Sequence, residues 1–550
     1  MNTSIPDHAT APGSDHLPGP TLDAGLDAGL DATLVTADRA DSALRPGTPG
    51  SAVRRVAVVG AGAAGTLTAA QLLYGAAERQ LPLEVWLIDP AETVGAGVAY
   101  GTEDLRHLLN VPAGAMSAFP DDPDHFLRWL AAWEPCPAST TGHQPHDFLP
   151  RHTYGRYLAH VLHRAVVETA AFGRLHQVRR RVVDAAQLPE GVELTLADGE
   201  RLTVQAAVLA LGLRPPGRHW APPALREHPA FVADPWAPGA LASVPTGGDV
   251  LLVGTGLTMA DTAITLARPG RVVHAVSRHG LAPYGHRATP APALTCTDSP
   301  AAPAGLTEAD GLDDLRRAVL RHLARARRNC GDWRPGIDSL RPLTSTLWQR
   351  LSDADRARFL REDLRQWEVH RHRLAPATAA ALAELLDRDR LTIAAAEVAD
   401  AQPAADDAVR VRLSDGRTLT ASAVVNCTGA PAELTSSDDA LHRALFQRGL
   451  ATAGPVGLGL ATADDGRLRP AARQAPAPLW TLGLLRRGEL LESTAMPEIR
   501  GQAADLARAV LHALTATEPP SIPIGEQCTP TATMAPPAPL DPAVGAAQPR

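Results

Sequence analysis

The stretch Arg54-Arg55-Val56-Ala57-Val58-Val59-Gly60-Ala61-Gly62-Ala63-Ala64-Gly65 decides the fold. Its first six residues are typical of a short buried strand, and Thr66 to Tyr74 begin a helix rich in good helix formers. Gly60 permits a tight turn, Gly62 lets the backbone approach a pyrophosphate, and Gly65 lets helix and strand pack closely. The stretch therefore predicts a Rossmann-like α/β unit, with phosphates on the amides of Ala63 and Ala64 at the helix N-terminus.

An acid follows this unit at the expected place. A second strand, Leu83 to Ile88, ends at Asp89, which is 24 residues after Gly65. A carboxylate there accepts hydrogen bonds from ribose hydroxyls and repels a 2′-phosphate, which fits the adenosine half of FAD or NAD. A glycine-rich turn without a ligand is the alternative, but strand, turn, helix, strand and acid together favour a nucleotide.

A second turn lies about 190 residues further on and has no such acid. Asp249 to Val253 leads as a strand into Gly254-Thr255-Gly256, and a helix follows, although Met259 stands at the third glycine position. The next strand, Arg271 to Val276, ends in Ser277-Arg278-His279. Arginine at that place accommodates a 2′-phosphate, and charge-assisted hydrogen bonds to it are worth about 1.5–3 kcal/mol. We therefore expect NADPH at Gly254, Gly256, Ser277 and Arg278, the alternative being that Arg278 is an ordinary solvated arginine.

Composition excludes several function classes. The chain has 550 residues, enough for two or three domains, and all of its 52 basic residues are arginine, so Schiff-base and P-loop lysines are excluded. The net charge of −8 argues against a nucleic-acid partner, and no apolar run reaches membrane-spanning length. The five cysteines form no CxxC pair, which argues against a dithiol reductase and against a metal site. The N-terminus lacks the pattern of a secretory signal, so we expect a cytoplasmic location.

The order of the signals predicts two Rossmann-like domains, one inserted into the other. Two similar hairpins would return the chain from one domain to the other. They are Val192 to Ala210 with an Asp198-Gly199 turn, and Val409 to Asn426 with an Asp415-Gly416 turn. Leucines and arginines alternate at helical spacing from about Asp310 to Asp387. We expect a disordered tail (1–52), the first part of a discontinuous FAD-binding domain (53–245), an NAD(P)H-binding domain (246–300) and a helical insertion that could contact substrate (301–390). A return segment with the second part of the FAD-binding domain (391–516) and a second disordered tail (517–550) would follow.

Four further strings resemble a bacterial family of FAD/NAD(P)-binding proteins that includes FAD-dependent urate hydroxylase and the nitrosuccinate-forming L-aspartate N-monooxygenase. They are Gly95 to Thr102, His107 to Ser117, Trp367 to Pro376 and Glu492 to Arg500, and the resemblance runs from about Arg55 to Arg500. It implies a monooxygenase in which NADPH reduces FAD, O₂ adds at C4a of the flavin, and the hydroperoxide passes one oxygen atom to a small polar substrate that bears nitrogen, for example an amino acid.

The resemblance also implies where the flavin lies. The segment from Asn110 through Val111 to Met116 would lie along the ring, and Gly483 would close the ribityl side. Asn110 could hydrogen-bond the ring or could only cap the turn before Val111-Pro112. Arg371 could clamp a substrate carboxylate or could only offset a helix dipole. Asn110 and Arg371 are thus the catalytic candidates.

Two other functions stay open at this point. The chain could be an NAD(P)H reductase or oxidase that uses the same flavin without oxygenation, or a flavin-binding scaffold that senses redox state. The FxGxxxHxxxW fingerprint of ketone-oxygenating flavoenzymes is absent, and Phe231 to Trp236 keeps only its aromatic frame. The predicted partners are a small substrate and O₂, and the oligomeric state is not specified by the sequence.

Overall fold

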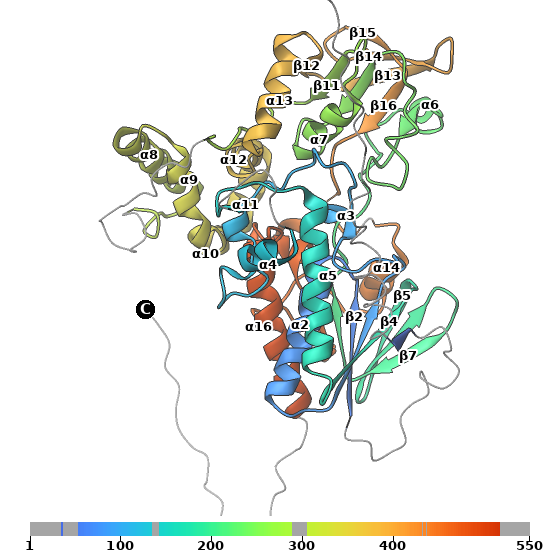
Figure 1. Cartoon of the computed structure of the whole chain (residues 1–550), viewed down its shortest axis with the longest axis vertical. Coiled ribbons are helices and arrows are strands. Elements are labelled where there is room, and N and C mark those ends of the chain that lie inside the picture. Colours follow the sequence, from blue (N-terminus) through green and yellow to red (C-terminus); the bar gives the residue numbers. More distant parts are fainter. Residues whose placement is uncertain are drawn as a thin grey trace, which may run out of the picture.

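A computed structural model describes residues 35–36, 53–134, 142–288, 305–431, 433–435 and 437–516 (Figure 1). The predicted tails, 1–52 and 517–550, lie outside these ranges except for the two residues of β1 (Val35–Thr36), which pair with β4 and so are not disordered. Within the described ranges, none of the helices combines the length and apolar character needed to cross a membrane.

The first domain is built on a six-stranded parallel sheet in the order β1-β4-β3-β2-β8-β17. Its remaining strands are β2 (Arg54–Val59), β3 (Leu83–Ile88), β4 (Gly173–Val178), β8 (Ala206–Leu209) and β17 (Leu479–Thr481). The predicted bounds of the first two strands are confirmed. The last strand comes from the far end of the chain, so this domain is discontinuous, as predicted.

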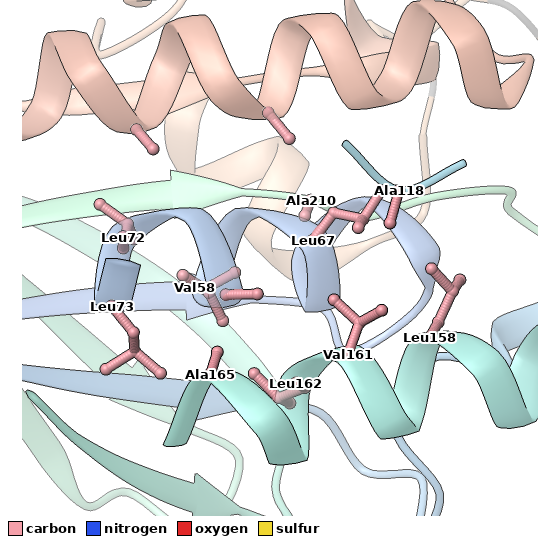
Figure 2. Packing of buried hydrophobic residues seen from close by; sticks show 14 of the residues in the cluster. Val58, Leu67, Leu72, Leu73, Ala118, Leu158, Val161, Leu162, Ala165 and Ala210 are labelled. Atoms are coloured by element: carbon pink, nitrogen blue, oxygen red, sulfur yellow. The ribbon is translucent and has the colours of Figure 1, made fainter. Parts of the chain in front are cut away.

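Side chains on successive residues of β2 point to opposite faces of this sheet. Val56 and Val58 pack with α2 (Ala63–Glu78), α5 (Arg151–Glu168) and α16 (Met496–Thr515). Figure 2 shows α2 between α5 and α16 on this face of the sheet, with Leu67, Leu72 and Leu73 in the shared apolar layer. On the other face, Ala57 and Val59 pack with the antiparallel sheet of β5 (Val182–Leu188), β6 (Gly191–Leu196) and β7 (Arg201–Val204), and with α14 (Ala440–Gln447).

The second domain has a five-stranded parallel sheet in the order β12-β11-β10-β16-β9. Its strands are β9 (Phe231–Val232), β10 (Val250–Val253), β11 (Val273–Ser277), β12 (Leu391–Ala395) and β16 (Ala423–Asn426). Two helices, α7 (Leu257–Leu266) and α13 (Pro376–Asp387), share a core with one face. A three-stranded antiparallel sheet of β13 (Val398–Pro403), β14 (Val409–Leu413) and β15 (Thr418–Ala421) packs on the other.

Sheet membership differs from the predicted domain limits. Residues 231–232, 391–395 and 423–426 pair inside the second sheet, although the sequence analysis assigned them to the FAD-binding domain. The reason is that buried parallel strands have the same apolar composition in both sheets. The two predicted hairpins are present, and each leads into a strand of a parallel sheet, β8 in the first and β16 in the second.

A helical insertion separates β11 from β12 and lies beside both domains (Figure 1). It comprises α8 (Leu312–Cys330), α9 (Arg334–Leu340), η2 (Arg341–Leu343), α10 (Thr344–Arg350), α11 (Asp353–Glu362) and α12 (Leu364–Arg371). Gly331 ends α8 in the left-handed conformation, and Ser352 caps α11 through the amide of Asp355.

Trp348 joins the insertion to the first domain, since its indole N–H donates to the Gly488 carbonyl at 2.7 Å. That carbonyl lies in α15 (Arg487–Leu490).

The remaining short elements are α3 (Gly97–Tyr100), η1 (Ala113–Ala115), α4 (His125–Trp133), α6 (Pro223–Arg226), η3 (Pro455–Gly457) and η4 (Gly483–Arg486).

Candidate functional site

The first glycine turn leaves no room for side chains at two positions. Gly60 has φ +106°, and a Cβ there would lie 2.2 Å from the Ala210 carbonyl oxygen. A Cβ at Gly65 would lie 1.8 Å from the Gly60 oxygen. Gly62 is different, because the nearest atom to its Cβ among the described residues would be the Gly97 Cα at 3.6 Å. The fold therefore requires glycine at 60 and 65, whereas Gly62 keeps a surface of the turn open.

The start of α2 fits the phosphates of a dinucleotide. In the described chain this helix has neither a side-chain cap nor an acidic residue in its first turn, so the amides of Ala63, Ala64 and Gly65 face no competing carboxylate there. Asp89 lies beside the turn, and its Oδ2 accepts the Ala61 amide at 2.8 Å. Besides its predicted ribose contact, this carboxylate therefore holds the turn in place, a role that the sequence analysis missed.

The segment predicted to follow the flavin ring runs from the first domain toward the second. The carbonyl of Asn110 accepts from His286 Nε2 at 3.1 Å. Burial and the nearby Arg373 lower the pKa of His286 to about 4, so this ring is neutral at pH 7. Val111 is half-buried, whereas Met116 is 1 % exposed and belongs to the core of the first domain. The Met116 side chain therefore anchors the segment in the core of the first domain and does not face a ligand.

Two residues near the C-terminus hold this region together. Gly483 has φ +72°, and its amide donates to Gln502 Oε1 at 3.0 Å, so α16 fixes the predicted ribityl side. Arg500 donates to the carbonyl of Ser117 at 3.1 Å. This contact joins α16 to the segment that carries the resemblance from His107 to Ser117.

The second turn repeats the geometry of the first. Gly254 has φ +108°, and a Cβ there would lie 2.3 Å from the Cys427 oxygen, while no described atom comes within 4 Å of a Cβ at Gly256. Met259, in place of the third glycine, is fully buried in the core, so the helix is packed without it. The open space over Gly256 is where a ligand could approach.

Ser277 ends β11 beside this turn, and Arg278 follows it. The hydroxyls of Ser277 and Thr255 lie 2.8 Å apart, and Arg278 is exposed, as a phosphate-binding side chain must be. Arg365 of the helical insertion also reaches the turn, since its Nη2 donates to the Thr255 carbonyl at 3.0 Å. No local sequence pattern predicts this contact, because the two residues are 110 positions apart.

Arg371 is bound inside the protein. Its Nε donates to Glu492 Oε2 at 3.1 Å, and the two side chains are 9 % and 8 % exposed. Trp367 donates to the other oxygen of Glu492 at 3.0 Å. Burial raises the pKa of Glu492, and the guanidinium of Arg371 opposes this rise. The prediction that Arg371 is a free clamp for a substrate carboxylate is therefore not supported by its contacts, because Glu492 already occupies it.

Metal ligands do not gather in the part of the chain that the structure describes, where no group of three or more His, Cys, Asp or Glu could hold an ion.

Comparisons with known proteins agree with this geometry. Residues 57–214 match a family model described as FAD-NAD(P)-binding, whereas no curated protein matches the chain in sequence. Ornithine hydroxylase from Pseudomonas aeruginosa is 15 % identical with a TM-score of 0.54, over 84 % of this chain and 100 % of that one. L-lysine 6-monooxygenase from Pseudomonas syringae is 17 % identical with a TM-score of 0.54, over 83 % and 99 %.

A third structure, the ornithine N-hydroxylase of Kutzneria sp. 744 with reduced FAD, NADP⁺ and L-ornithine, is 15 % identical with a TM-score of 0.54, over 84 % and 99 %. At these identities the likeness shows the fold. The predicted fold class is thereby confirmed: residues 57–214 belong to an FAD/NAD(P)-binding domain, and most of the chain has the two-domain fold of these three proteins.

Proposed function

We propose that the protein is an FAD- and NADPH-dependent monooxygenase that inserts one oxygen atom of O₂ into a small polar substrate bearing nitrogen. One observation carries this proposal: a glycine turn of the same geometry follows a strand in each of two separate parallel sheets. One of the contacts between the two domains is the hydrogen bond between Asn110 and His286. Two nucleotides held in this way suit the passage of electrons from one to the other. The fold likeness to ornithine and lysine hydroxylases supports an amine as substrate.

The first turn would hold FAD. Gly60, Gly62 and Gly65 would admit the diphosphate to the amides of α2, and Asp89 would accept the ribose hydroxyls. Asn110 and Val111 would lie against the ring and Gly483 on the ribityl side. When bound, this cofactor supplies the reaction with O₂, and the protein supplies orientation and the exclusion of water.

The second turn would hold NADPH. Gly254 and Gly256 would admit its diphosphate, Ser277 would lie beside it, and the exposed Arg278 would bind the 2′-phosphate. Arg365 would keep the turn in shape from the insertion, through the Thr255 carbonyl. NADPH is thus preferred to NADH in this proposal.

Aromatic side chains would wall the substrate region beside Asn110. Tyr284 packs on Trp333 and His370, with ring centroids 5.4 and 4.7 Å away, and Phe148 packs on His286 at 4.9 Å. These rings come from both domains and from the insertion. The proposal covers urate, aspartate and basic amino acids as substrates. The resemblance to the urate and aspartate oxygenases stays a prediction.

Anaerobic titration of the FAD-loaded protein with NADPH, with NADH in parallel, tests the proposal. NADPH should bleach the flavin, and admission of ¹⁸O₂ with L-ornithine, L-lysine, L-aspartate or urate should place one ¹⁸O atom in one of them. Peroxide as the sole product with every substrate would favour the oxidase. A flavin that binds but is not bleached would favour the redox scaffold. A protein that binds no FAD would refute all three.

A further inference from the structure

A buried polar joint connects the two domains next to both turns. Arg151, the first residue of α5, places its Nη2 2.7 Å from Asp261 Oδ2 on α7. Asp261 is 3 % exposed. Burial raises the pKa of its carboxyl, and Arg151 and His107 oppose this rise. The ion pair therefore lies between one helix from each domain, with Asp261 buried and the Arg151 side chain 16 % exposed.

Further hydrogen bonds surround this pair. His107, which is 1 % exposed, places Nε2 2.8 Å from the Thr265 hydroxyl and 3.3 Å from the Asp261 carbonyl oxygen. The Thr265 hydroxyl donates to Asp104 Oδ2 at 2.7 Å, and Arg106 donates to the Ile264 carbonyl at 3.1 Å. We call the set Asp104, Arg106, His107, Arg151, Asp261 and Thr265 the domain joint.

The ring of Trp236 closes the joint. It lies 5.7 Å from the His107 ring in an edge-on arrangement, and the Arg151 guanidinium stands 5.8 Å above it. An ion pair so enclosed stabilises a fold little more than apolar side chains of the same size would, because both charges lose their hydration. What it adds is orientation, since hydrogen bonds and charges fix the relative position of two surfaces more narrowly than apolar contacts do.

The joint is placed where orientation matters for the proposed reaction. Asp261 is five residues past Gly256, so it is about 8 Å along α7 from the second turn. His107 is three residues before Asn110, and its carbonyl accepts the Arg151 amide at 2.9 Å. A shift at the joint would therefore move the second turn relative to the segment at Asn110.

We propose that Arg151 and Asp261 are positioning residues for the reduction of the flavin. In this step, which rests on the proposed function, a hydride leaves NADPH to give NADP⁺, and FAD becomes FADH⁻. The ion pair sets the distance and angle between the nicotinamide and flavin rings, while each turn binds its own nucleotide independently of the joint.

The test compares Arg151→Gln, Asp261→Asn and the milder Thr265→Val with the wild type. Arg151→Lys keeps the charge and should recover part of the loss. Arg448→Gln is the matched control, because Arg448 makes two hydrogen bonds to Asp184 within the first domain, far from the joint. FAD content and NADP⁺ affinity are measured first, and both should stay near the wild-type values in all variants.

Two readouts then decide the proposal. In anaerobic stopped-flow experiments at saturating NADPH, Arg151→Gln should reduce its flavin roughly 10- to 100-fold more slowly, since a displacement of about 1 Å has effects of this size. In hydrogen–deuterium exchange of the FAD-loaded protein without NADPH, the amides of residues 104–112 and 257–266 should exchange faster in Arg151→Gln and Thr265→Val but not in Arg448→Gln.

The outcomes separate the two proposals. A wild type that NADPH cannot bleach refutes the proposed function, and the exchange data then still show whether the joint fixes the domains. A wild type that is bleached, with Arg151→Gln reduced at the same rate and exchanging at the same rate, refutes the positioning role. A weaker NADP⁺ affinity with an unchanged limiting rate also refutes it, because the pair would then act on binding. If Arg151→Gln fails to fold, Thr265→Val decides in its place.

Discussion

The substitution Gly256→Ala should weaken NADPH binding at the second turn and change the stability of the fold very little. The added Cβ would meet no described atom within 4 Å, and the residue has φ −86°, which alanine adopts freely. Its only structural cost is that alanine is a poorer N-cap than glycine, about 1 kcal/mol or less. A nucleotide diphosphate close to the backbone would collide with the new methyl group, so NADPH affinity should fall at least about tenfold, or 1.4 kcal/mol.

Alanine at Gly254 is the opposite case. A Cβ 2.3 Å from the Cys427 oxygen must displace backbone, at about 1–3 kcal/mol. The φ of +108° adds about 1–3 kcal/mol for a residue with a side chain. Gly254→Ala should therefore lower the free energy of unfolding by about 2–6 kcal/mol.

The assay pairs urea unfolding with anaerobic NADPH titration of the FAD-loaded protein. Gly247→Ala serves as the control, because this glycine also faces no described atom within 4 Å yet lies before β10, away from the turn. If Gly256→Ala and Gly247→Ala bind NADPH with the same affinity as the wild type, the second turn does not hold the nicotinamide nucleotide.

Three more predictions concern single side chains. Arg278→Gln should weaken NADPH about 10- to 100-fold and leave NADH unchanged in steady-state kinetics, whereas the exposed Arg410→Gln should change neither. Burial lowers the pKa of His160 to about 4. As the pH falls from about 6.5 to 4, the unfolded state binds a proton before the folded state does, so the free energy of unfolding should drop by about 1–3 kcal/mol. Urea unfolding of His160→Asn should show a smaller drop over this pH range, and an equal drop would contradict this reasoning. Glu492→Gln should lower the free energy of unfolding by about 1.5–3 kcal/mol, since it removes the nearer of the two carboxylates beside the buried Arg371 and leaves Glu498 at 4.0 Å. A cost below that of an exposed ion pair, about 1 kcal/mol or less, would contradict this reasoning.

Local signals in the sequence predicted the first turn well. The strand, turn, helix and second strand around Gly60 and Asp89 depend on residues close together in the chain. The structure has both strands at the predicted bounds, and the helix begins at Ala63, three residues before the predicted Thr66. The two hairpins were also found, because an Asp-Gly pair between alternating strands has a local explanation.

Partners distant in the sequence were not predicted. Asp261 pairs with Arg151, 110 positions away, and nothing near Asp261 in the chain indicates this partner. Glu492 likewise meets Arg371 across 121 positions, so the sequence left that arginine looking free for a substrate. Domain limits failed for a related reason, since a strand's own residues do not state which of two similar parallel sheets it joins.

The first glycine of each turn packs against a carbonyl that is distant in the sequence, and this affects folding during synthesis on the ribosome. Gly60 rests against Ala210, and Gly254 rests against Cys427, so each turn takes its final shape only after at least 150 further residues have emerged. The edge strand of the first sheet, β17, arrives later still. The inserted domain can thus mature while its host is unfinished, and a nascent chain of which residues up to 426 but not 479 have emerged would carry a complete second sheet beside an incomplete first one.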